Sequence, residues 1–102
     1  MLPNTAPNLA VITNRELTLG QTLTLTAVAN DSDVPAQTLT FSLGAGAPAG
    51  ATITPLAGQF SWQPSSAPAN VSISVVVTDD GVPNLAATRT FNVTVYPPPT
   101  IT

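Results

Sequence analysis

The sequence of 102 residues has no cysteine, no histidine and no lysine, and its two cations are the isolated Arg15 and Arg89. Without cysteine the chain cannot form a disulfide, a thiolate nucleophile or a cysteine-based metal site. Without histidine it lacks the commonest general base and the commonest metal ligand. These absences argue against an enzyme.

Charge of either sign is also scarce, with five acidic residues against the two arginines and a net charge of −3. Binding to nucleic acid or to an anionic membrane surface requires clustered cations, which this chain does not have. No apolar run approaches the roughly 18 residues of a transmembrane helix, and the N-terminus does not resemble a signal peptide. We therefore expect a soluble domain that neither binds nucleic acid nor inserts into membranes. If it is exported, the signal lies upstream on a longer polypeptide.

In place of charge the sequence is rich in threonine, serine and aliphatic residues, which alternate along the chain. Over residues 21–29 the leucines and alanines occupy odd positions and threonines the even ones, and residues 37–43, 71–78 and 87–95 follow the same pattern. A period of two is typical of half-buried β-strands. The abundance of β-branched and aliphatic residues also argues against a disordered chain.

Seven short strands are predicted by this alternation, separated by clusters of Asp, Asn, Gly and Pro. They cover residues 9–13, 21–29, 37–43, 51–53, 59–62, 71–78 and 87–95. We predict an all-β Greek-key sandwich of the immunoglobulin/cadherin-like type, with about seven strands and no disulfide. The sandwich is expected over residues 8–96, between a linker at 1–7 and a proline-rich linker at 97–102.

Six short motifs, taken in order, carry a family resemblance. They are Asn4-Thr5-Ala6-Pro7, Gly20-Gln21-Thr22-Leu23-Thr24-Leu25, Asp31-Ser32-Asp33 followed by Leu39-Thr40-Phe41-Ser42-Leu43, Pro48-Ala49-Gly50-Ala51-Thr52-Ile53, Gly58-Gln59-Phe60-Ser61-Trp62-Gln63-Pro64, and Val77-Thr78-Asp79-Asp80-Gly81-Val82-Pro83. In this order the chain resembles the bacterial and archaeal cadherin-like repeats, which are grouped as dystroglycan-type cadherin or immunoglobulin-like domains of surface and secreted proteins. The resemblance covers residues 4–95.

The resemblance implies a non-catalytic structural or adhesive module of a larger secreted or cell-surface protein, acting as a spacer or an interaction domain. Members of such families usually occur in tandem. The expected partners are therefore neighbouring repeats of the same chain or another surface protein, and the expected location is extracellular or at the cell surface.

The resemblance also implies a calcium site where one repeat meets the next, and it assigns Asp31, Asp33 and Asp79 as ligands. Calcium takes six to eight oxygen ligands, so two aspartate loops at one end of a sandwich suit it. The linker ligands of cadherins are reduced here to Pro3-Asn4-Thr5, which implies weak binding of Ca²⁺. The alternative is that these aspartates form turns, because Asp side chains bond to their own backbone in turns.

An accessory carbohydrate-binding module of a polysaccharide-degrading enzyme is the alternative function, with a polysaccharide as partner. Such a module stacks sugars on exposed aromatic rings. Alternation places Phe60 and Trp62 together on the core face, which leaves Tyr96 as the one expected exposed ring. A glycosidase using only Asp carboxylates would need a cleft for which so small a sandwich has little volume.

Overall fold

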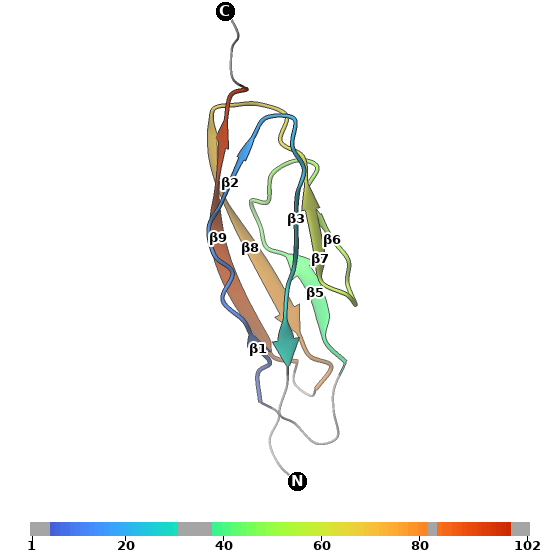
Figure 1. Cartoon of the computed structure of the whole chain (residues 1–102). Coiled ribbons are helices and arrows are strands. Elements are labelled where there is room, and N and C mark those ends of the chain that lie inside the picture. The colour runs from blue at the N-terminus through green and yellow to red at the C-terminus, as the bar shows by residue number, and fades with distance from the viewer. Residues whose placement is uncertain (1–4, 31–37, 82–83, 99–102) are drawn as a thin grey trace, which may run out of the picture.

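The computed structural model describes residues 5–30, 38–81 and 84–98 (Figure 1), and in these ranges the regular structure is strand, with no helix. The described residues form nine strands: β1 (Asn8–Leu9), β2 (Arg15–Thr18), β3 (Leu23–Thr26), β4 (Ala29–Asn30), β5 (Thr40–Leu43), β6 (Thr52–Ile53), β7 (Gln59–Trp62), β8 (Ala69–Thr78) and β9 (Ala86–Tyr96). The predicted all-β class is confirmed.

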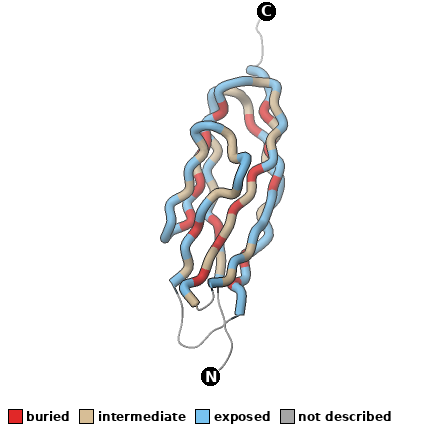
Figure 2. Tube along the Cα trace, turned by 180° about the vertical axis from the view of Figure 1, so that it is seen from behind, coloured by how far each residue is buried: buried red, intermediate tan, exposed pale blue. Residues whose placement is uncertain are grey.

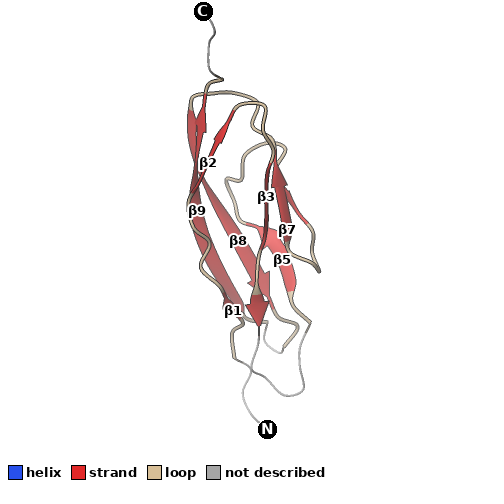
Figure 3. Ribbon diagram, in the orientation of Figure 1, coloured by secondary structure: helices blue, strands red, loops and turns tan. Residues whose placement is uncertain are grey.

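The strands form two facing layers (Figure 3). One layer is a four-stranded sheet in the order β2-β9-β8-β5, and the other contains the three-stranded sheet β3-β7-β6 and the pair β1-β4. The long antiparallel hairpin of β8 and β9 pairs Ala69 with Val95 at one end and Thr78 with Ala86 at the other. This hairpin runs the length of the molecule.

The N-terminal segment changes layers. β1 pairs antiparallel with β4, whereas β2 pairs parallel with β9 in the other sheet. The expectation of one strand over residues 9–13 is therefore wrong beyond its first residues. The Ala10 N–H still donates to the Val28 carbonyl at 2.9 Å, and the chain then crosses to the other layer. Strand β3 and the first residue of β4 lie within the predicted run 21–29. That run is interrupted at residues 27–28, where the Ala27 N–H donates to the Gly58 carbonyl at 2.8 Å. Strand β2 (Arg15–Thr18) lies in none of the seven predicted ranges and was missed, whereas each of the other described strands overlaps one of them.

Alternation along the strands fills the core, as the buried positions in Figure 2 show. The buried apolar residues are Leu9, Leu17, Ala27, Phe41, Phe60, Trp62, Ile73, Val75, Val77, Phe91, Val93 and Val95. Phe60 and Phe91 meet edge to face across the two layers, with ring centroids 5.8 Å apart. Leu23 and Leu25, which the pattern also places inside, are half-buried at the margin of this core.

The predicted turn between β6 and β7 is present. The Gly58 N–H donates to the Thr54 carbonyl at 2.9 Å, and the Gln59 N–H donates to Thr54 Oγ1 at 2.9 Å. Gly58 has a φ of +68° and packs closely against Ala27 and Phe41 of neighbouring segments. The turn therefore fixes the position of β7 against both layers.

Candidate functional site

Asp79 follows directly after β8 and is only 3% exposed, which makes it the one buried charged residue recorded in the described ranges. Its Oδ1 accepts hydrogen bonds from the backbone N–H groups of Gly81 (3.1 Å) and Leu85 (2.9 Å). Its backbone N–H donates to the Leu85 carbonyl at 2.9 Å, and its carbonyl accepts from Asn84 Nδ2 at 2.9 Å. The carboxylate therefore organises the loop between β8 and β9.

A second aspartate ties this loop to a distant part of the chain. Asp80 Oδ1 accepts a hydrogen bond of 3.1 Å from the backbone N–H of Thr38, which lies 42 residues away, just before β5. Backbone N–H groups held by aspartate oxygens are the turn chemistry proposed as the alternative to a metal site. For Asp79, whose Oδ1 accepts from the N–H of Gly81 two residues on, the structure shows that chemistry directly, whereas the Asp80 bond joins two distant segments.

Asp31 and Asp33, the other two predicted calcium ligands, lie outside the described residues. Across the parts of the chain that the structure describes, no three His, Cys, Asp or Glu side chains gather in a position to hold a metal ion. Calcium requires six to eight oxygens, and Asp79 Oδ1 already accepts two backbone hydrogen bonds. The described residues thus do not by themselves form a calcium shell, and calcium binding stays a prediction.

Glu16 and Tyr96 meet where β2 and β9 end, at the opposite end of the molecule. Thr18 pairs with Tyr96 in the parallel ladder, and Tyr96 Oη donates to Glu16 Oε1 at 2.9 Å. This hydrogen bond, followed by the charge of Glu16, raises the pKa of Tyr96 above its ordinary 10.0. The tyrosine ring is 47% exposed beside the C-terminal prolines.

The other four aromatic residues are buried, which confirms the predicted core position of Phe60 and Trp62. Trp62 is 5% exposed, and its indole Nε1 donates to the Ala49 carbonyl at 3.2 Å. All five aromatic residues of the sequence lie in the described ranges. The domain therefore presents one exposed ring and no aromatic platform.

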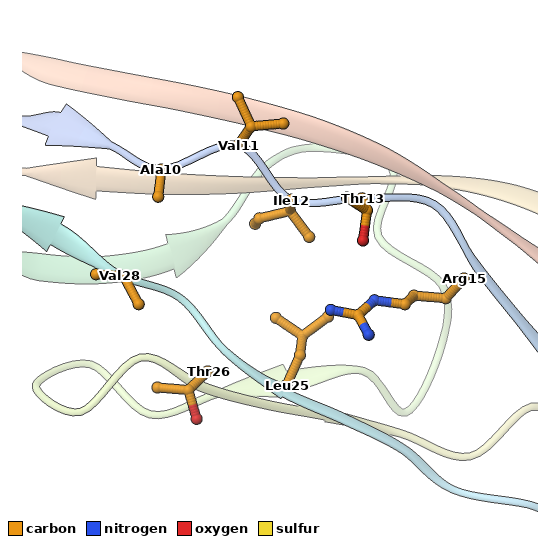
Figure 4. A pocket seen from close by; sticks show the side chains of 8 residues that line it. All are labelled: Ala10, Val11, Ile12, Thr13, Arg15, Leu25, Thr26 and Val28. Carbon is orange, nitrogen blue, oxygen red and sulfur yellow. The ribbon is translucent and has the colours of Figure 1, made fainter.

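Sequence reasoning missed a pocket of about 110 Å³ on one flank, between residues 10–15 and the stretch from Leu25 to Val28. Arg15 extends into this pocket (Figure 4). No motif signals the pocket, because an isolated arginine in a β-strand has no distinctive pattern.

Comparison with family models gives one match: the family He_PIG, described as "Putative Ig domain", matches residues 5–96. The chain belongs to the He_PIG family. The predicted cadherin-like or immunoglobulin-like nature of the chain is confirmed by this match and by the solved structures to which it is similar. Among curated proteins the He_PIG domain finds no match.

Three solved structures illustrate the similarity. Mouse cadherin-23 EC22-24 has a TM-score of 0.69 and 20% identity, covering 91% of the He_PIG domain and 31% of that chain. Human protocadherin-24 EC1-2 has a TM-score of 0.68 and 19% identity, and the match covers 91% of the He_PIG domain and 44% of that chain. The third is a nucleoside hydrolase-related hypothetical protein from Saccharophagus degradans that is associated with carbohydrate metabolism. It has a TM-score of 0.63 and 22% identity, and the match covers 90% of the He_PIG domain and 26% of that chain. At these identities the likeness shows the fold, and the He_PIG domain spans less than half of each chain.

A search of the described residues for a helix that could cross a membrane finds none.

Proposed function

We propose that this domain is a non-catalytic structural module, a spacer within a longer extracellular or cell-surface protein. The observation that carries the proposal is the position of the first and last strands. β1 lies near one end of the long axis, and β9 runs to the opposite end before the chain leaves the sandwich (Figure 1). A domain of this kind adds its own length to a chain of neighbours.

Both ends of the domain are tied to the same central hairpin. Near the N-terminus, Arg89 Nε of β9 donates to the Leu9 carbonyl at 2.9 Å. At the other end, the Leu19 N–H donates to the Tyr96 carbonyl at 2.9 Å. The β8 strand between these ends has ten residues, and at a rise of about 3.3 Å per residue it spans roughly 30 Å. Tension on the two termini would therefore act on the contacts between the N-terminal segment and β9, including the parallel ladder of β2 with β9.

Small-angle X-ray scattering tests the spacer role. Two copies of the full chain, joined through their own terminal segments, should have a maximum dimension close to twice that of one copy. The scattering curve of a single copy in the same buffer is the control. A pair that folds back side by side, with little increase in maximum dimension, would contradict the proposal.

Partners of the module are proposed to be neighbouring repeats of the same chain or another surface protein. At the Asp79 end, we propose that Asp31, Asp33 and Asp79 bind calcium weakly when a preceding repeat supplies further oxygens. Binding of metal only to the folded state stabilises it, by about 2.7 kcal/mol at a hundredfold excess over Kd.

Melting curves in calcium, in magnesium and in EDTA, at matched ionic strength, test this for one copy and for two joined copies. At about 10 mM calcium, above the affinity range of extracellular modules, only the joined copies should melt at a higher temperature. The paired change Asp31→Asn/Asp33→Asn should remove that rise. Identical curves for the joined copies in all three solutions would leave these aspartates as turn residues.

The alternative is an accessory carbohydrate-binding module, and the similarity to the Saccharophagus degradans protein is the observation in its favour. The burial of Trp62 and the single exposed ring of Tyr96 weigh against it. Titration with soluble plant and algal polysaccharides should leave Trp62 fluorescence and the heat of mixing unchanged. Saturable binding would support the alternative.

A further inference from the structure

The flank pocket lies where the N-terminal segment crosses between the layers. Its walls come from residues 10–15 on one side and from the stretch between Leu25 and Val28 on the other. Figure 4 shows the guanidinium group of Arg15 projecting into this space toward Leu25. The pocket volume is about 110 Å³, and Arg15 is the one charged residue among those that line it.

The Nε atom of Arg15 is buried and has no hydrogen-bond partner in the described part of the chain. A buried donor without an acceptor is costly, because it gives up water and gains nothing in return. Two other charged side chains differ in this respect: Arg89 Nε donates to the Leu9 carbonyl, and Glu16, next in sequence, accepts from Tyr96 at the surface. Arg15 therefore offers an unused cationic donor inside a pocket.

The rim of the pocket is aliphatic and unusually open to solvent. Val11 is 70% exposed and Val28 is 62% exposed, and both line the pocket. These two valines are half of the large hydrophobic residues that the described surface exposes most. Their position beside the guanidinium of Arg15 brings a charged group and an apolar surface together.

The strands on this flank are both sheet edges. β2 is the last strand of the four-stranded sheet, and β3 is the last strand of the three-stranded sheet. Edge strands can accept an added extended segment through their free backbone groups. At the Ala10 end of the pocket the two walls are joined, since the Ala10 N–H donates to the Val28 carbonyl at 2.9 Å, so an added segment would pair with the β2 or β3 edge beyond that point.

We propose that this flank docks an extended segment of a partner protein whose Asp or Glu carboxylate enters the pocket and binds Arg15, while aliphatic neighbours cover Val11 and Val28. The planar guanidinium matches a carboxylate through two parallel hydrogen bonds. The pocket volume of about 110 Å³ is several times the roughly 10–15 Å³ that one water needs, which leaves room for a carboxylate and its methylene. The rim has no aromatic ring, which favours a protein segment over a sugar.

The two arginines allow a direct test by ¹⁵N–¹H NMR, since the full chain gives two Nε–H signals and Arg89 is an internal control. The probes are the blocked peptides acetyl-Val-Val-Glu-Val-Val-amide and its Gln counterpart. The Glu peptide should shift the Arg15 Nε–H signal saturably and leave that of Arg89 in place. The Gln peptide should bind at least about tenfold more weakly, because it lacks the charge-assisted hydrogen bond.

Single substitutions test the contributions of Arg15 and of the exposed valines separately. Arg15→Lys keeps the positive charge but loses the planar guanidinium that can form two parallel hydrogen bonds, so it should reduce affinity for the Glu peptide. Val28→Thr should weaken binding of the peptide, whereas Leu56→Thr, at an exposed leucine outside the pocket lining, should not. If Arg15→Lys fails to fold, the comparison of the two peptides on the unaltered chain still decides.

Three results would overturn the proposal. Equal shifts with the Glu and Gln peptides would show that the carboxylate is not recognised. An equal effect of sodium acetate at the same concentration would show that the valines play no part. Saturable binding of polygalacturonate but not of the Glu peptide would assign the pocket to a uronic acid instead. The spacer role does not depend on this site, and scattering measurements test it separately.

Discussion

Replacing Gly58 with alanine should destabilise the domain more than its backbone conformation alone would require. A Cβ at this position would lie 3.0 Å from the Ala27 carbonyl oxygen and 3.1 Å from two ring carbons of Phe41. Residue Ala27 cannot move away freely, because its N–H, in the peptide unit before that carbonyl, donates to the Gly58 carbonyl at 2.8 Å. The Phe41 ring is buried in the core and is equally constrained.

The expected magnitude has two parts. A non-glycine residue in the left-handed region costs about 1–2 kcal/mol, and overpacking of a filled core typically costs about 1–3 kcal/mol. Gly58→Ala should therefore lower the free energy of unfolding by about 2–5 kcal/mol. Urea unfolding followed by circular dichroism and by Trp62 fluorescence measures this by linear extrapolation.

Gly46→Ala is the matched control. Gly46 has a φ of +87°, and apart from its chain neighbours no residue lies within 4 Å of the place its new methyl group would take, so only the backbone cost of about 1–2 kcal/mol applies. The φ of Gly58, +68°, lies closer to the usual left-handed value of about +57°. Backbone strain alone therefore predicts that Gly46→Ala is the more harmful change. If Gly58→Ala costs no more than Gly46→Ala, the crowding argument is refuted.

Three other changes test the core, the loop and the C-terminal end. Phe41→Ala should cost about 3–5 kcal/mol in urea unfolding, whereas Thr24→Ala on the exposed face should stay within about 0.5 kcal/mol, and equal effects would refute the inward and outward assignment. Asp79→Ala should cost about 2–4 kcal/mol, because two backbone N–H groups lose a charged acceptor in a buried loop, and a neutral result would mean that the loop does not depend on it. The single tyrosine should titrate above pH 10.0 by its absorbance, and Glu16→Gln should lower that midpoint. Since the raised pKa favours the neutral phenol, the hydrogen bond between Tyr96 and Glu16 contributes to stability below pH 10.0. That contribution is lost as the pH rises through the pKa of Tyr96 in the folded state. An unchanged titration midpoint in Glu16→Gln would refute the role of Glu16.

The sequence predicts the interior well where the strands are long. The alternating residues of β8 and β9, from Ile73 to Val77 and from Phe91 to Val95, are fully or almost fully buried, as a period of two requires. The same rule places Phe60 and Trp62 in the core. In each case a single strand carries enough alternation to define its own inner face.

The parts that the sequence does not predict depend on contacts between distant segments. The parallel pairing of β2 with β9 joins Arg15 to Val93, and nothing local in the sequence Arg-Glu-Leu-Thr indicates such a partner. The flank pocket arises because that same segment crosses between layers. The aspartate loops were predicted as either turns or metal ligands, and for Asp79 the structure shows the hydrogen bonds of a turn.

The distribution of polar groups favours a module that acts at its ends and on one flank. On the outer face of the long hairpin, hydroxyl and amide groups satisfy one another: Ser72 Oγ donates to Asn92 Oδ1 at 2.7 Å, and Ser74 and Thr90 share a hydrogen bond of 2.9 Å. A surface whose polar groups are paired in this way offers little for a ligand to recognise. Among the described charged residues, Asp79 and Asp80 lie at one end and Glu16 beside the C-terminal strand at the other, while Arg15 and Arg89 lie on β2 and β9. A spacer of this kind can make specific charged contacts with its neighbours at its ends, while the paired polar groups of the hairpin face leave little there for a partner to bind.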